Sequence, residues 1–415
     1  MAVAIGVAVT LALAPSFASA SRAAKAAAFA VTAAESPSPT QMLGVNTGVL
    51  FNSRSYTQAQ IDSQLAALAQ TGAKVVRSDA LWENTEPNPP IGVVHLHRYD
   101  WSFDDLIVHS LAAHGLQWFP IIDYTAPWDE SVPGQVHSPP LSVSDYAAYA
   151  AALAARYGPG GLFWIENPQL TPLPVDTYEI WNEPDNPVFW HHSPDAATYA
   201  SLYTGARAAI TAVQPAARVI VGGLMHPVSF LSAMLAAAPA LAGQIDGVAI
   251  HPYAATPADV LVGVRNARLA MRSHGLASVP LYVTEFGWTT RQSRARDSAP
   301  EQARPGYISS TISTLGHTDC GIAAVLLYAW ATPERDPANA QDWFGISPPG
   351  AGGSPDTAAF ASGLHAAAAP GPTVSLCAPD TVLATRTSRP ARRARPARHR
   401  PRSPAHRHRK RHKRR

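Results

Sequence analysis

Several signals that mark ligand-dependent proteins are absent from this 415-residue sequence. The histidines are scattered or lie in the C-terminal tail, and the aspartates do not cluster at the spacing of zinc or calcium ligands. No glycine-rich phosphate-binding loop follows the first predicted strand, at residues 43–46. We therefore expect no metal and no cofactor, and nucleotide-binding folds are disfavoured.

Acidic residues are missing from the last 30 positions, which makes the charge uneven along the chain. Residues 386–415 hold 15 of the 32 Lys and Arg residues, so the first 385 carry 17 bases against 29 acids, a net charge of −12. The tail has several prolines and no apolar periodicity, so we expect it to be disordered. Its expected partner is an anionic polymer of the cell envelope or an acidic polysaccharide. A nucleic-acid partner is not expected, because the body of the chain is acidic.

The N-terminus lacks the basic residues with which an export signal usually begins. An apolar stretch at 3–14 and the small residues Ala18-Ser19-Ala20 are nevertheless typical of a signal peptide at 1–20, either cleaved or kept as an anchor. The apolar stretch is well short of the ~20 residues of a membrane-spanning helix. We expect a secreted protein, retained at the cell envelope by its tail, with an Ala/Ser/Pro-rich linker at 21–41.

From Met42 onward, short apolar runs alternate with amphipathic helical stretches eight times. This alternation predicts a single-domain (β/α)8 TIM barrel at 42–368, followed by an extension at 369–385 and the basic tail. A doubly wound open sheet is the alternative fold. We expect the barrel to be monomeric.

Polar and aromatic side chains gather where the predicted strands end. In a (β/α)8 barrel the carboxyl ends of the strands form one mouth, so these side chains are expected to converge. Two of them are glutamates, and hydrolysis of a glycosidic bond needs a pair of carboxylates. The strand-end residues are Arg77, Asp123, Asn182, Glu183, His251, Tyr253, Glu285 and Trp330.

Four of these strand ends together resemble glycoside hydrolase clan A. The resemblance rests on Trp181-Asn182-Glu183-Pro184, His251-Pro252-Tyr253, Thr284-Glu285-Phe286-Gly287 and Trp330, and it spans about 42–368. The segment after Glu183 is closest to family 39, with the cellulase-like family 5 second. The resemblance implies a retaining glycoside hydrolase that cleaves β-linked glycosides or polysaccharide by double displacement.

The resemblance also implies a role for each residue. Glu183 would be the acid/base and Glu285 the nucleophile, with Asn182 on the sugar 2-hydroxyl. Tyr253 and Arg77 would orient the nucleophile, and a guanidinium beside Glu285 would keep it ionised. His251 would line the same subsite and Trp330 would form a platform under the sugar; Trp190 and Asp123 are further candidates for substrate contact. The alternatives are a transglycosylase with the same residues and a carbohydrate-binding barrel that has lost turnover.

Only two cysteines are present, Cys320 and Cys377. Both fall on the N-terminal side of the predicted barrel, one before the last strand and one after the last helix. In an exported protein we expect them to form a disulfide that holds the end of the chain to the barrel.

Overall fold

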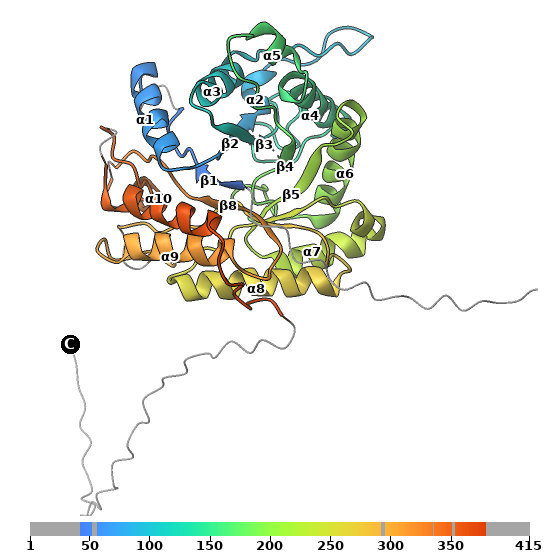
Figure 1. The fold of residues 1–415 in the computed structure, drawn as a ribbon. Coiled ribbons are helices and arrows are strands. Elements are labelled where there is room, and N and C mark those ends of the chain that lie inside the picture. The colour runs from blue at the N-terminus through green and yellow to red at the C-terminus, as the bar shows by residue number, and fades with distance from the viewer. Residues whose placement is uncertain (1–41, 52–55, 292–294, 335, 351–352, 379–415) are drawn as a thin grey trace, which may run out of the picture. The chain divides into compact units, whose positions relative to one another are not determined.

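The expected (β/α)8 fold is confirmed by the structure, a computed structural model that describes residues 42–51, 56–291, 295–334, 336–350 and 353–378 (Figure 1). Its eight parallel strands pair in chain order, and β8 pairs with β1 to close the barrel. The strands are β1 (Met42–Asn46), β2 (Val75–Leu81), β3 (Gln117–Asp123), β4 (Thr177–Ile180), β5 (Arg218–Leu224), β6 (Val248–Ile250), β7 (Leu281–Val283) and β8 (Ile322–Leu327).

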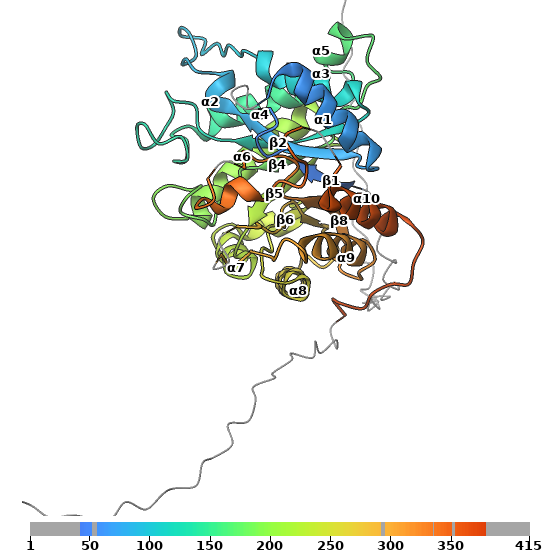
Figure 2. The same cartoon turned by 90° about the vertical axis from the view of Figure 1, so that its left-hand side faces the viewer.

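A ring of helices surrounds the strands, as Figures 1 and 2 show. Side chains cap several of them; Thr57 and Ser354, for example, each form a capping box at the start of α1 and α10. The helices of the repeat are α1 (Gln58–Gln70), α3 (Ser102–Ala113), α4 (Val143–Tyr157), α6 (Ala196–Val213), α7 (Pro227–Ala237), α8 (Pro257–Ser273), α9 (Arg304–Gly316) and α10 (Pro355–Ala368). Short helices that the sequence pattern did not predict lie in the connections: α2 (Trp82–Thr85), α5 (Leu162–Glu166), η1 (Pro239–Gly243) and η2 (Ala340–Trp343).

Two hydrophobic clusters fill the fold. The larger cluster includes most of the buried residues of the helices and of the outward strand positions. The smaller one lies inside the barrel, and its buried members are Val75, Phe119, Ile220, Ala249, Tyr282, Ala324 and Leu326. Because side chains alternate along a strand, positions two residues further on also face inward, nearer the mouth. Arg77 follows Val75 in this way on β2, and Asp123 lies four residues after Phe119 on β3, so polar groups replace apolar ones toward the mouth.

The end of the described chain is held to the barrel as expected. Cys320 and Cys377 form a disulfide with a Cα–Cα distance of 5.1 Å. Beside it, the Asp319 carboxylate accepts hydrogen bonds from the backbone N–H groups of residues 376–378. The predicted signal peptide (1–20), linker (21–41) and basic tail (386–415) lie outside the described residues. Within the described residues, no helix is both long enough and apolar enough to cross a membrane.

Candidate active site

Glu285 lies two residues beyond β7, in the mouth of the barrel, and is held by donors on both oxygens. Its Oε1 accepts a hydrogen bond from Arg77 Nη1 at 2.5 Å, and its Oε2 accepts one from the Tyr253 hydroxyl at 2.8 Å. Burial acts to raise the pKa of Glu285, but His251, Arg77 and Tyr253 together outweigh it and lower that pKa. Glu285 is therefore an ionised carboxylate, the state that a nucleophile requires. Arg77 and Tyr253 therefore lie against Glu285, as the resemblance to clan A implied.

Arg77 is the electrostatic centre of the site, and all five of its N–H donors are used. Two of them bind Glu179 in a fork, at 2.8 and 3.0 Å, and one binds Glu285. The other two bind the side-chain oxygens of Asn46 and Asn182, at 2.7 and 3.1 Å. Burial opposes the charge, but the two glutamates outweigh it and raise the pKa of Arg77. One cation thus binds two carboxylates, those of Glu179 and Glu285.

Glu179 is fully buried in the wall of the barrel, which makes it a structural member of this network. Besides Arg77 it accepts a hydrogen bond from the backbone N–H of Gly223 at 2.7 Å. A side chain at Gly223 would not fit, because a Cβ there would lie 1.9 Å from His251 Nε2. Glycine at this position lets β5 approach the imidazole closely.

Glu183 reaches the mouth through an unusual backbone turn after β4. Trp181 and Glu183 both have left-handed backbone conformations, with φ of 66° and 46°. Such conformations are costly for residues other than glycine and concentrate at functional sites. Oε1 of Glu183 lies 2.8 Å from His251 Nδ1, and Oε2 accepts a hydrogen bond from Asn186 Nδ2 at 2.6 Å. The turn brings the carboxylate into the mouth, where an imidazole and an amide are its partners.

His251 joins the two glutamates. Its Nδ1 is 2.8 Å from Glu183 and 3.6 Å from Glu285, and carboxylate oxygens of the two residues lie within 4.8 Å of each other. Burial opposes protonation of His251, but the charges of Glu285 and Glu183 outweigh it and raise its pKa. Its Nε2 lies 3.1 Å from the Thr284 hydroxyl, which can donate or accept, so the ring has a partner in either neutral tautomer.

The predicted platform at Trp330 is wrong. The Trp330 side chain is 1% exposed, and its indole N–H donates a hydrogen bond to Gln64 of α1 at 2.8 Å. The alternation of β8 ends at Leu327, and beyond that residue the backbone turns, so the inward direction of Leu326 does not extend to Trp330. Tyr328 instead occupies the inward position and is partly exposed. Its ring centroid lies 6.2 Å from that of Tyr253.

Trp190 and Asp123 do not reach the substrate space either. Trp190 is 1% exposed and packs edge-on between Trp181 and Tyr199, so its ring belongs to the core. Asp123 is 0% exposed, and neither carboxylate oxygen has a hydrogen-bond partner among the described residues. Burial and the neighbouring Asp79 raise the pKa of Asp123 well above its usual value. The predicted direct contacts of both residues with substrate are therefore wrong.

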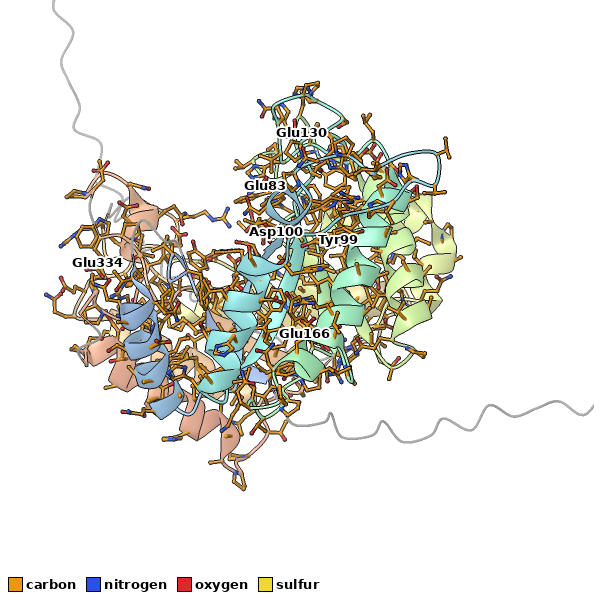
Figure 3. The ribbon with its side chains drawn as sticks, turned by 90° about the horizontal axis from the view of Figure 1, so that it is seen from above. Glu83, Tyr99, Asp100, Glu130, Glu166 and Glu334 are labelled. Carbon is orange, nitrogen blue, oxygen red and sulfur yellow. A yellow bond between two sulfur atoms is a disulfide. The ribbon has the colours of Figure 1, made fainter. Side chains whose placement is uncertain are left out.

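The mouth also contains residues that the sequence pattern did not single out. Asp79, two positions after Arg77 on β2, is exposed and has the same inward direction, a signal that strand alternation could have provided. The Tyr124 hydroxyl accepts a hydrogen bond from Asn182 Nδ2 at 3.3 Å. Figure 3 shows Glu83 and Glu130 on the connections after β2 and β3, and Glu334 on the one after β8. The loops on this face of the barrel thus carry further acidic groups.

Comparison with known proteins supports this fold. No family model and no curated protein matches the sequence. A monomeric β-xylosidase from Caulobacter crescentus CB15 is 19% identical, with a TM-score of 0.60 over 79% of this chain and 68% of that chain. A family 39 glycoside hydrolase from Xanthomonas axonopodis pv. citri is also 19% identical, with a TM-score of 0.60 over 79% and 67%. Fungal β-1,4-galactanase is 15% identical, with a TM-score of 0.53 over 77% and 99%. At these identities the matches establish the fold, and the expected resemblance to clan A is confirmed at that level.

Proposed function

We propose that the protein is a retaining glycoside hydrolase that cleaves β-linked glycosides or polysaccharide, with Glu183 as acid/base and Glu285 as nucleophile. The observation that carries this proposal is the short distance between the two carboxylates, whose oxygens lie within 4.8 Å. Retaining enzymes hold the pair about 5–5.5 Å apart, whereas inverting enzymes need about 6.5–9.5 Å to admit a water molecule. The spacing therefore favours direct attack by a carboxylate.

The two glutamates have environments suited to different roles. Glu285, ionised between Arg77 and Tyr253, attacks the anomeric carbon and forms a glycosyl-enzyme ester. Glu183 donates its proton to the leaving oxygen as that bond breaks. In the second step Glu183 removes a proton from water, which attacks the anomeric carbon and releases Glu285. His251 stays hydrogen-bonded to Glu183 throughout, with the tautomer set by the proton on that carboxyl.

The rest of the mouth offers groups for binding a sugar. Asn182 directly precedes Glu183, and its side-chain amide contacts Arg77 and Tyr124, which favours a contact with a ring hydroxyl of the sugar. The partly exposed ring of Tyr328 provides the apolar face that stacks under a pyranose. Asp79 is an exposed acceptor for hydroxyl groups. These groups favour a glycan substrate and leave open whether it is cleaved or transferred to a second sugar.

Export, oligomeric state and the role of the tail belong to the same proposal. The Cys320–Cys377 disulfide supports a secreted protein, because disulfides persist in oxidising compartments. The β-xylosidase from Caulobacter crescentus CB15 is monomeric, which supports a monomer here. The 15 basic residues of 386–415 would hold an acidic barrel on an anionic cell-envelope polymer while leaving the mouth free.

A panel of aryl β-glycosides and soluble polysaccharides tests the activity, with Glu285→Ala and Glu183→Ala as variants. Both should lose turnover, and azide should rescue Glu285→Ala as a glycosyl azide of inverted configuration and Glu183→Ala as one of retained configuration. Glu166→Ala is the matched control, since Glu166 is a carboxylate on α5 paired with Arg156, and it should behave as wild type. Rescue of Glu285→Ala with retained configuration would reverse the assignment. Wild-type product of inverted configuration would exclude the retaining mechanism.

A further inference from the structure

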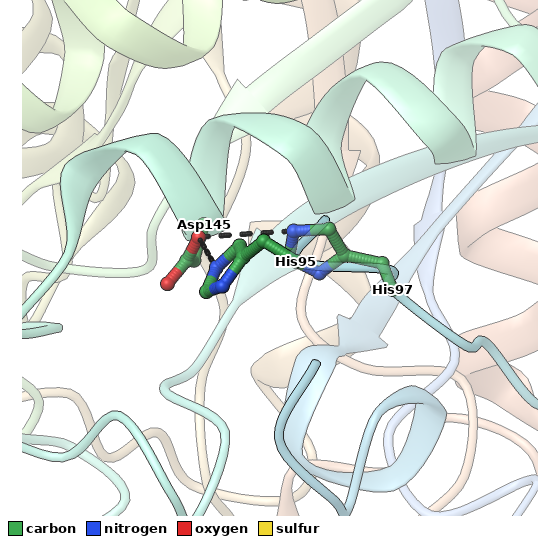
Figure 4. A group of neighbouring side chains, drawn as sticks. All are labelled: His95, His97 and Asp145. Atoms are coloured by element: carbon green, nitrogen blue, oxygen red, sulfur yellow. Dashed lines mark hydrogen bonds and ion pairs between the residues drawn. The ribbon is translucent and has the colours of Figure 1, made fainter. Parts of the chain in front are cut away.

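Two histidines and a carboxylate meet outside the active site, between the connection after β2 and the start of α4 (Figure 4). Nε2 of His95 lies 2.7 Å from Oδ1 of Asp145, and Nε2 of His97 lies 3.7 Å from the same oxygen. Ligand atoms of all three residues lie within 4.8 Å of one another. The sequence spacing gave no sign of this group, because Asp145 follows the histidines by about fifty residues.

His97 has an orientation that its hydrogen bonds explain only in part. Its Nδ1 lies 2.9 Å from the carboxylate of Glu86, which is fully buried and acts as an acceptor for Trp82 Nε1 and the Arg98 N–H. Nδ1 therefore carries the hydrogen in neutral His97, and Nε2 presents a lone pair. That lone pair faces Asp145 Oδ1, another acceptor, at a distance too long for a hydrogen bond. A cation between these two atoms would bind both of them, and His95 Nε2 is within 2.7 Å of the same oxygen.

We propose that His95, His97 and Asp145 bind a divalent transition metal of the zinc class. Zinc binds imidazole nitrogen and carboxylate oxygen at about 2.0–2.2 Å, so tetrahedral ligands lie about 3.3 Å apart. The distances of 2.7 and 3.7 Å from Asp145 Oδ1 to the two nitrogens lie on either side of that value. Three protein ligands leave a fourth position for water.

The surroundings of the group favour a bound cation. A histidine that binds metal commonly donates its other N–H to a carboxylate, and Glu86 occupies that position behind His97. The Asp129 carboxylate interacts electrostatically with both Asp145 and His95 and adds a further negative charge. The ligands are borne by the segment between α2 and α3 and by the first turn of α4. A metal here would tie the connection after β2 to the one after β3, on the same face of the barrel as the mouth.

Zinc binding by the full-length, chelator-treated protein tests the site, with calorimetric titration of ZnCl2. His95→Asn is the first variant, because His95 is 58% exposed and has φ of 52°, a conformation that asparagine tolerates. His97→Ala is the second, and both should bind one equivalent of zinc fewer than wild type. Glu86→Gln should keep the stoichiometry but weaken that equivalent by about 10–100-fold.

His109→Ala is the matched control, since His109 is an exposed histidine on α3, and its titration should equal that of wild type. Any zinc bound by the tail histidines or by the group of Glu183, His251 and Glu285 is common to all variants and cancels in the comparison. Circular dichroism confirms that each variant is folded. Equal stoichiometry and affinity in wild type and in folded His95→Asn and His97→Ala would overturn the proposal and leave a hydrogen-bonded ion pair.

Discussion

Replacing Tyr253 by phenylalanine isolates one of the two hydrogen bonds that keep Glu285 ionised. The hydroxyl donates to Oε2 at 2.8 Å, whereas the ring packs at 5.9 Å from Phe344, a contact that phenylalanine keeps. A hydrogen bond to a charged group contributes about 1.5–3 kcal/mol. One pKa unit corresponds to about 1.4 kcal/mol, so losing the bond should raise the pKa of Glu285 by about 1–2 units. The pKa rises, and does not fall, because the lost hydroxyl stabilised the charged form of the Glu285 carboxyl.

The assay is the pH dependence of kcat/KM with the best aryl glycoside, between pH 3.5 and 8. The acid limb of Tyr253→Phe should move up by about 1–2 pH units, because a larger fraction of Glu285 is protonated at each acidic pH. Tyr328→Phe is the matched control: it removes a hydroxyl from the neighbouring ring, and the hydrogen bonds of Glu285 within the described structure come from Arg77 and Tyr253. An unmoved limb in Tyr253→Phe, or an equal movement in Tyr328→Phe, would refute the reasoning.

Three further predictions concern stability and retention. Burial raises the pKa of Asp104 to about 7, above its unfolded value of 3.8, so its contribution to stability falls as pH rises from about 4 to 7. Urea unfolding should therefore show that Asp104→Asn is more stable than wild type by up to about 4 kcal/mol at pH 8, with little gain at pH 4. An equal gain in unfolding free energy at the two pH values would contradict the raised pKa of Asp104. Because the disulfide links residues 57 positions apart, Cys320→Ala/Cys377→Ala should lose about 4 kcal/mol of unfolding free energy, and an unchanged urea midpoint would argue against it. Deleting residues 386–415 should release the protein from the envelope fraction at low salt without changing hydrolysis of a small neutral glycoside. Raising salt from ~0.05 to ~0.5 M should release the intact chain in the same way; identical partitioning of the two forms at low salt would remove the role given to the tail.

The barrel and the carboxylate pair could be predicted because both depend on local pattern. Strand and helix periods alternate eight times, and parallel strands place their carboxyl ends at one mouth, so Glu183 and Glu285 could be brought together without knowing any distance. The same pattern places Arg77, on β2, and Tyr253, three residues after β6, at this mouth, and the resemblance to clan A implied that both contact Glu285.

Features that depend on the backbone beyond the strands could not be predicted. Strand alternation does not apply once a strand has ended, so the sequence could not show that the Trp330 ring is buried while the Tyr328 ring is partly exposed. Trp190 lies in the connection after β4, where no periodic pattern of apolar residues indicates which side chains are buried. The left-handed conformations that direct Glu183 into the mouth are adopted by Trp181 and Glu183 themselves. Because neither residue is a glycine, the sequence does not indicate these conformations.

The disulfide determines the end of the barrel from which the chain departs. Cys320 directly precedes β8, so Cys377 is held at the end where the strands begin, and β1 also begins there, at Met42. Glu183 and Glu285 follow the opposite ends of β4 and β7. Both terminal segments are therefore attached on the side remote from the mouth. A label or solid support attached next to Met42 or Cys377 would therefore lie at the opposite end of the barrel from Glu183 and Glu285.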